Sequence, residues 1–124
     1  MTKRNTRQRE AILTALGQAG RPLGPQEILV FARQSVPRLG IATVYRNVRN
    51  LVEAGQIRVV LLPGSSDRYE LAGKHHHHHF HCRECDGVFE VDGCDEDFSG
   101  VTPRGFSLER HEVTLYGLCP TCSS

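Results

Sequence analysis

The sequence predicts an α+β protein built in two parts. Apolar residues recur at helical spacing through the first half of the 124-residue chain, whereas short β-forming segments fill the second half. Residues 1–62 contain ten Lys or Arg and three acidic residues, which gives a net charge of +7. Residues 63–124 contain five Lys or Arg and eleven acidic residues, which gives a net charge of −6. We expect the basic half to bind a polyanion such as DNA and the acidic half, which holds every His and Cys, to bind cations.

Composition restricts the class of protein further. With 39% hydrophobic and 23% charged residues the chain is in the globular range, and its length suits one ordinary domain or two small ones. No apolar run approaches the roughly 20 residues of a membrane span, and residues 1–9 are polar with no hydrophobic stretch after them. We therefore expect a cytoplasmic protein with no membrane partner.

Two helices are expected first. The segment NTRQREAILTALGQAG spaces its apolar residues on one helical face, with Thr6 as the expected N-cap and Gly20 as the stop. The next segment, GPQEILVFARQSVP, begins with Pro25, which suits a first helical position, and its helical pattern runs until Pro37.

The third expected helix, in GIATVYRNVRNLVEAG, has two different faces. Val44, Val48 and Leu51 form an apolar stripe that would pack on the first two helices. The opposite face carries Ala42, Tyr45, Arg46 and Arg49. Arginine can pair with guanine or phosphate, and an aromatic edge can pack on a thymine methyl, so this face suits the major groove. Taken alone, a solvated basic face explains the pattern about as well.

A hairpin follows the three helices. The segment IRVVLLPGSSDRYEL predicts two strands joined by a Pro-Gly-Ser-Ser-Asp turn, and three helices followed by a hairpin form a winged helix-turn-helix. Arg4 and Arg7 precede the first helix and are candidates for phosphate or minor-groove contacts, although terminal basic residues are usually solvated. The candidate DNA-binding residues are Arg4, Thr43, Tyr45, Arg46 and Arg49.

Two CxxC motifs, CREC and CPTC, provide four soft metal ligands. Their cysteines, Cys82, Cys85, Cys119 and Cys122, match a closed tetrahedral zinc site, which is a structural site. A disulfide framework requires a secreted context and an even number of cysteines, and redox or iron–sulfur motifs fit this spacing less well. We expect structural zinc, with Cys94 as a spare thiol.

Five consecutive histidines, residues 75–79, precede the first CxxC motif. On an extended strand successive side chains point to opposite faces, so His77 and His79 would face one way and His76 and His78 the other. One segment would then supply two metal sites. A purification tag is excluded by position, because tags lie at a terminus.

Carboxylates complete both histidine pairs. Glu70 and Glu90 would join the first pair in a mixed nitrogen and oxygen shell that suits zinc, iron(II) or manganese(II). His111 and a carboxylate from Asp95–Asp97 would join the second pair, although acidic loop residues are usually just solvated. The pattern indicates no role for His81.

These segments together resemble the ferric uptake regulator family of bacterial metal-responsive transcription factors. The resemblance rests on GIATVYR, HHHHHFHCREC, HEVTLYGLC and the terminal CxxC, in this order over nearly the whole chain. It implies a winged-helix DNA-binding domain at residues 1–70 and a small α/β dimerisation domain at residues 71–124. It also implies a homodimer that represses metal-homeostasis genes by binding palindromic operator DNA when metal is bound, and no enzyme activity.

The resemblance also assigns ligands and one DNA contact. It implies structural zinc at the four CxxC cysteines and a DNA-contacting Tyr45 beside Arg46. The implied regulatory site, for Zn²⁺, Fe²⁺ or Mn²⁺, consists of Glu70, His77, His79 and Glu90. The implied further site consists of His76, His78, Asp97 and His111.

Two features depart from the family pattern. Pro22 stands where many members place a histidine ligand of the regulatory site, so the link to the DNA-binding domain must differ. The segment at residues 92–110 is short and is interrupted by Gly100, Pro103 and Gly105. We therefore expect the helix that the family usually has in this segment to be reduced or absent.

We expect a conformational switch. With the regulatory site empty, a linker around residues 63–71 would leave the DNA-binding domains free to move, and metal would restrict their angle. Three alternatives are less consistent with the sequence. A zinc hydrolase lacks a nucleophile motif, a histidine-rich storage or delivery protein needs no DNA-reading helix, and a peroxide sensor of this family usually has Asp in place of Glu90.

Overall fold

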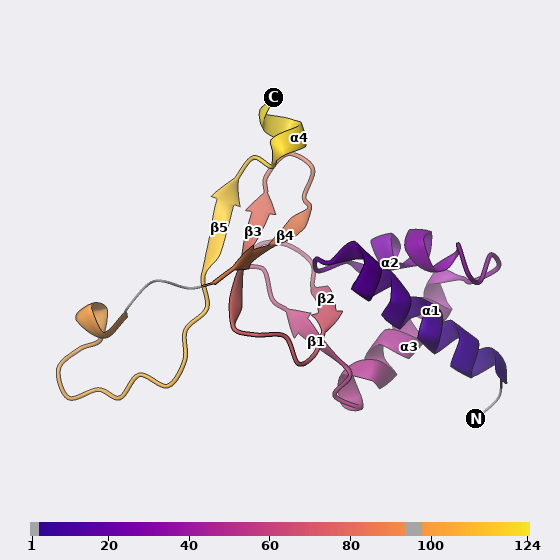
Figure 1. Ribbon diagram of the computed structural model, residues 1–124, viewed down its shortest axis with the longest axis horizontal. Helices are drawn as coiled ribbons and strands as arrows, with labels where there is room; N and C mark the ends of the chain where they lie inside the picture. The colour runs from indigo at the N-terminus through magenta and orange to yellow at the C-terminus, as the bar shows by residue number, and fades with distance from the viewer. Residues whose placement is uncertain (1–2, 94–97) are drawn as a thin grey trace. The chain divides into compact units, whose positions relative to one another are not determined.

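The structure is a computed structural model that describes residues 3–93 and 98–124 (Figure 1). The chain divides into two compact units, Met1–Lys74 and His75–Ser124. The second unit thus begins at His75, whereas the sequence placed the second domain from residue 71. Among the described residues, no helix combines the length and apolar character needed to cross a membrane.

Three helices and a hairpin form the first unit. Their order is α1 (Lys3–Ala19), α2 (Pro25–Ala32), α3 (Ile41–Glu53), β1 (Ile57–Val60) and β2 (Arg68–Leu71). β1 and β2 pair antiparallel. Leu23 adds a short bridge to Tyr69 on β2, with N–H to carbonyl distances of 2.9 and 2.8 Å in the two directions. Three helices with this small sheet form a winged helix-turn-helix, as the sequence predicts.

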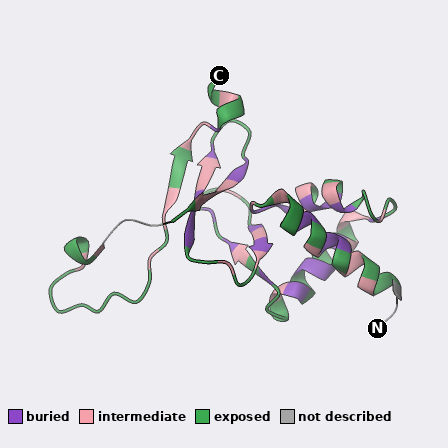
Figure 2. Cartoon of the chain, in the orientation of Figure 1, coloured by how far each residue is buried: buried purple, intermediate pink, exposed green. Residues whose placement is uncertain are grey.

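The apolar faces of the helices supply the core of the first unit. Twelve buried residues from α1, α2, α3, β1 and the loops between them make one cluster, and Figure 2 shows buried residues along one side of each helix. The predicted stripe of α3, Val44, Val48 and Leu51, lies in this cluster. Burying each such side chain contributes about 1.5–3 kcal/mol, so the core is large enough to hold the first unit together.

Three expected boundaries in the first unit are wrong. α1 begins at Lys3, so Thr6 lies inside it, because no Gly or Pro precedes Thr6 to stop the helix. α2 ends at Ala32, well before Pro37, because the chain tightens there into i→i+3 bonds such as Ser35 N–H to the Ala32 carbonyl (3.0 Å). The expected linker at residues 63–71 overlaps β2, the strand that the hairpin prediction had itself placed at this position.

The second unit contains a three-stranded sheet in the order β4-β3-β5. Its elements are β3 (His77–Cys82), β4 (Val88–Asp92), the 3₁₀ turn η1 (Phe98–Val101), β5 (Thr114–Gly117) and α4 (Pro120–Ser123). β3 pairs antiparallel with β4 and parallel with β5. Among residues 98–124 the helices are a single 3₁₀ turn and the four-residue α4, in agreement with the expected reduction. The predicted α+β class is confirmed.

Candidate metal centres and DNA-binding surface

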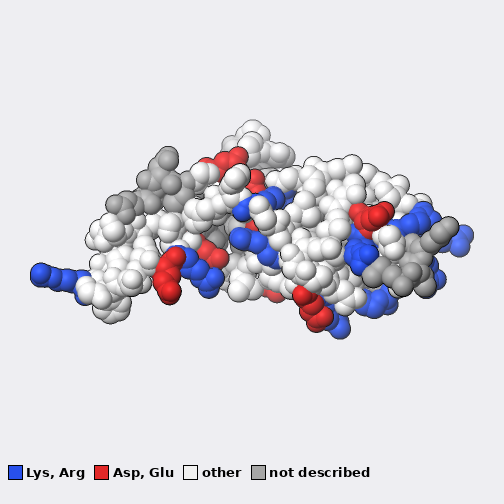
Figure 3. All heavy atoms as spheres, turned by 60° about the horizontal axis from the view of Figure 1, so that its bottom comes forward, with Lys and Arg blue, Asp and Glu red and all other residues white. Residues whose placement is uncertain are grey.

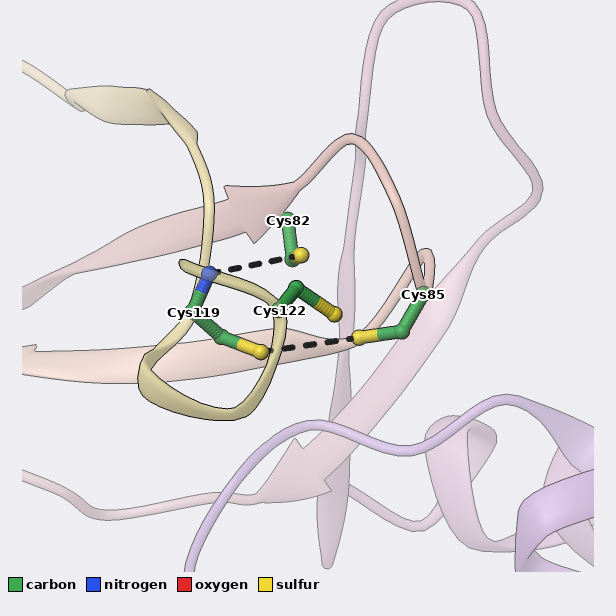
Figure 4. Close-up of side chains that lie close together, drawn as sticks. All are labelled: Cys82, Cys85, Cys119 and Cys122. Atoms are coloured by element: carbon green, nitrogen blue, oxygen red, sulfur yellow. Dashed lines mark hydrogen bonds between the residues drawn. The ribbon is translucent and has the colours of Figure 1, made fainter. Parts of the chain in front are cut away.

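The four CxxC cysteines come together at one edge of the second unit. Cys82 is the last residue of β3, and Cys85 lies in the turn that follows. Cys119 immediately precedes α4, and Cys122 lies within it, just after β5 in the chain (Figure 4). β3 and β5 are parallel neighbours, with Cys82 opposite Gly117, so both strands end at this edge. The four sulfurs lie within 4.8 Å of one another, and those of Cys85 and Cys119 are 3.9 Å apart.

This spacing fits zinc. A tetrahedral ion with Zn–S bonds of about 2.3 Å holds its sulfurs about 3.8 Å apart, close to the separation of Cys85 and Cys119. Backbone amides of Cys85 and Cys119 hydrogen-bond to the Cys82 sulfur and lower its pKa to about 6. The Cys119 thiol and burial raise the pKa of Cys122 to about 12. Sulfurs this crowded cannot all be thiolates without a cation, and zinc supplies that charge.

The turn of the first CxxC motif is shaped by Asp86 and His81. Asp86 has φ of 63°, a left-handed conformation that Asp tolerates better than most residues, and its N–H donates to the Cys82 carbonyl at 3.0 Å. The carboxylate of Asp86 lies 2.5 Å from Nε2 of His81. His81 therefore holds this turn, a role that the sequence did not indicate because it depends on the fold of the loop.

His77, His79 and Glu90 meet on one face of the β3–β4 pair. Glu90 is the cross-strand partner of His79, and its Oε1 is 3.6 Å from Nε2 of His77. The rings of His77 and His79 have centroids 4.9 Å apart. The Nδ1–H of His77 donates to the His75 carbonyl at 2.6 Å, which leaves Nε2 of His77 with the lone pair that binds metal. The backbone of His75 thus orients a candidate ligand, a contribution that the sequence pattern did not indicate.

Glu70, the fourth predicted ligand of this set, belongs to the first unit. It lies on β2 directly opposite Arg58 of β1, and Oε2 of Glu70 is 2.8 Å from Nε of Arg58. Pro22, which replaces a possible histidine ligand, is buried in the same unit. Glu70 is therefore the predicted ligand of this set that belongs to the first unit.

A second histidine group forms on the other face of β3. The ring centroid of His76 lies 4.6 Å from that of His78 and 4.9 Å from that of His111. One ring nitrogen from each of the three residues lies within 4.8 Å of the other two. β3 begins only at His77, so the expected strand from His75 is too long, yet His76 still lies on the side of His78. The N–H of Val113 donates to Nδ1 of His78 at 3.1 Å and ties this group to the start of β5.

The surroundings of His78 disfavour its protonated form. Burial, followed by the neighbouring imidazoles of His76 and His111, lowers the pKa of His78, so His78 is neutral at pH 7. Neutral imidazole is the form that ligates metal, but Nδ1 of His78 accepts from Val113 and leaves the ring proton on Nε2, so His78 would bind metal only by giving up this hydrogen bond. Asp97, the carboxylate predicted for this site, lies outside the described residues, as do Cys94 and Asp95.

The outer face of α3 is exposed as predicted. Arg46 and Arg49 are exposed, Tyr45 is 50% exposed, and Thr43 is half-buried. Figure 3 shows Lys and Arg atoms (blue) over the first unit, at the right of the view, with only scattered acidic atoms among them. The candidate Arg4, near the start of α1, is exposed too.

The hairpin packs against α3 through β1. Burial, followed by the charges of Asp67 and Tyr45, raises the pKa of Tyr69 on β2. On the inner side, Nδ2 of the buried Asn47 donates to the Thr43 carbonyl at 2.9 Å within α3. A reading helix next to a wing is the arrangement that places side chains in a major groove.

These features define a two-unit protein in which a winged helix-turn-helix is joined to a small sheet carrying cysteine and histidine metal-ligand groups. The ferric uptake regulator family matches residues 1–116, and the chain belongs to this family. The resemblance seen in the sequence is thereby confirmed.

Individual relatives agree with this assignment. The ferric uptake regulation protein of Campylobacter jejuni is 32% identical over 124 residues, covering 96% of this chain and 79% of the relative. The solved structure of the Helicobacter pylori ferric uptake regulator, reported to have three functional metal binding sites, matches with a TM-score of 0.74 at 30% identity. That match covers 94% of this chain and 80% of the other. A zinc-bound manganese uptake regulator matches with a TM-score of 0.76 at 26% identity over 96% and 89% of the two chains.

Proposed function

We propose that this chain is a metal-dependent transcriptional repressor of metal-homeostasis genes. It binds palindromic operator DNA as a homodimer when a divalent metal occupies the regulatory site, and zinc at the four CxxC cysteines is structural. The ligands of the regulatory site are Glu70, His77, His79 and Glu90. Two imidazoles and two carboxylates suit Zn²⁺, Fe²⁺ and Mn²⁺ alike, so the donor set alone does not select one of them.

The observation that carries the proposal is how the ligands are distributed between the units. Glu70 lies in the hairpin of the winged helix-turn-helix, whereas His77, His79 and Glu90 gather on one strand pair of the second unit. A metal bound by all four therefore links the units through Glu70, which replaces the link that Pro22 cannot make. The metal acts by favouring those arrangements in which both α3 helices of a dimer reach their half-sites.

The exposed face of α3 supports DNA as the partner. Tyr45, Arg46 and Arg49 are the side chains that would read bases and phosphates in the major groove. A symmetric dimer repeats this face about a two-fold axis, which matches palindromic half-sites spaced by about 34 Å or a multiple of it. Under the alternative function, a histidine-rich storage or delivery protein, this face of α3 would have no role. That alternative predicts no preference for a palindrome over random DNA.

The test is metal-dependent DNA binding by a His77→Ala/His79→Ala variant. The DNA is a palindrome selected from random sequences by the metal-loaded wild type, and affinity is measured by fluorescence anisotropy with Zn²⁺, Fe²⁺ and Mn²⁺ in turn. We expect metal to tighten wild-type binding about 5- to 150-fold and to have no effect on the variant, whose circular dichroism is unchanged.

The matched control is His75→Ala. It removes an imidazole from the same run but keeps the carbonyl that accepts from Nδ1 of His77, so its metal response should equal that of the wild type. An undiminished metal response in the double variant would contradict the assignment of the regulatory site.

A further inference from the structure

The ion pair between Arg58 and Glu70 has a consequence for metal sensing. The two residues are directly opposite each other in the hairpin, and Nε of Arg58 is 2.8 Å from Oε2 of Glu70. The Glu70 side chain is fully buried, while the Arg58 side chain keeps 47% of its surface exposed. A buried carboxylate that is ionised needs a nearby cation, and Arg58 supplies one without any metal.

We propose that Arg58 competes with the regulatory metal for Glu70 and thereby sets the metal concentration at which the protein responds. This inference rests on the proposed function, because it requires Glu70 to be a ligand. The guanidinium withdraws electron density from the carboxylate that a metal would use, and its own positive charge repels a divalent cation at that carboxylate. Metal binding thus includes the loss or weakening of the ion pair.

The exposure of Arg58 makes this exchange feasible. A guanidinium that is already half in water loses little on moving fully into solvent, since its hydration offsets the lost ion pair. A buried arginine would instead keep an uncompensated charge in the interior when the metal bound its carboxylate partner. Arg68 on β2 is the contrast, because its side chain is only 5% exposed and donates to the Ser66 carbonyl. Arg58 is therefore a positioning residue that acts on the metal only through Glu70.

The test is Arg58→Gln, which removes the charge and keeps a polar side chain of similar length. Metal affinity is measured without DNA, by competition with a chromophoric chelator, and thermal unfolding of the protein lacking regulatory metal is followed alongside. We expect about tenfold tighter metal binding, a coupling of ordinary size, together with a lower melting temperature of the metal-free form. A purely structural role would weaken metal binding instead.

Two further variants serve as controls. Arg58→Lys retains the positive charge and should bind metal within about threefold of the wild type, since the competition is electrostatic. Arg38→Gln removes an exposed arginine from the loop before α3 and should leave metal affinity unchanged.

Glu70→Gln separates this inference from the proposed function. If Glu70→Gln leaves metal affinity unaltered, Glu70 is not a ligand, and both the proposed regulatory site and the competition by Arg58 are refuted. If Glu70→Gln weakens binding but Arg58→Gln does not tighten it, only the competition is refuted. In the Glu70→Gln background, Arg58→Gln should have no effect on metal affinity, because the two residues form one thermodynamic cycle.

Discussion

Loss of zinc from the four CxxC cysteines is expected to unfold the second unit while the first unit stays folded. In the described part of the second unit the buried apolar side chains are Cys82, Val88 and Cys119, and two of these are zinc ligands. At about 1.5–3 kcal/mol each, so few buried groups do not offset the entropy of ordering the chain. Structural zinc contributes about 10–16 kcal/mol in zinc-finger peptides, so the metal replaces a hydrophobic core here.

The variant for this prediction is Cys119→Ser, studied by hydrogen exchange resolved along the chain. Amides of β3, β4 and β5 should lose their protection, whereas those of α1 and α3 keep it, because the core cluster of twelve residues lies wholly in the first unit. Cys94→Ser, at the cysteine outside both motifs, should change neither zinc content nor protection. A Cys119→Ser protein that lacks zinc by metal analysis and yet keeps β3 protected would refute this account.

Local sequence patterns predicted the elements whose cause is local. The sequence predicted α3 and both of its faces, because the apolar and basic residues each recur at helical spacing within one segment. The alternation of the histidines followed likewise from the period of a strand, and His77 and His79 do share a face with Glu90. The cysteine ligands were recognisable because each CxxC motif is a short, self-contained pattern.

Features that depend on pairing between distant segments were not predictable in the same way. The strand at residues 68–71 was predicted as part of the hairpin, but the register that places Glu70 opposite Arg58 was not, because it depends on how β1 and β2 pair. The ion pair with Arg58 depends on that same register. Likewise, the parallel pairing of β3 with β5 brings Cys82 and Cys119 to one edge, and no property of either motif requires it.

Arg46→Ala is expected to weaken operator binding by about 10- to 100-fold with metal binding unchanged. Arg46 lies on the exposed face of α3 beside Tyr45, and a lost arginine contact to guanine or phosphate costs about 1–3 kcal/mol. Affinity is measured with saturating metal on the selected palindrome over a series of salt concentrations. Arg104→Ala removes an exposed arginine from the second unit and should alter neither affinity nor salt dependence.

Salt dependence and specificity together show what each side chain on α3 contacts. If Arg46 binds phosphate, its loss weakens all DNA sequences equally and lowers the slope of log affinity against log salt by about one. If Arg46 reads a base, its loss reduces the preference for the palindrome over random DNA. Tyr45 is not a basic residue, so Tyr45→Ala should reduce the preference for the palindrome and leave the salt slope unchanged. Unaltered affinity for both DNAs in both variants would show that α3 does not enter the groove.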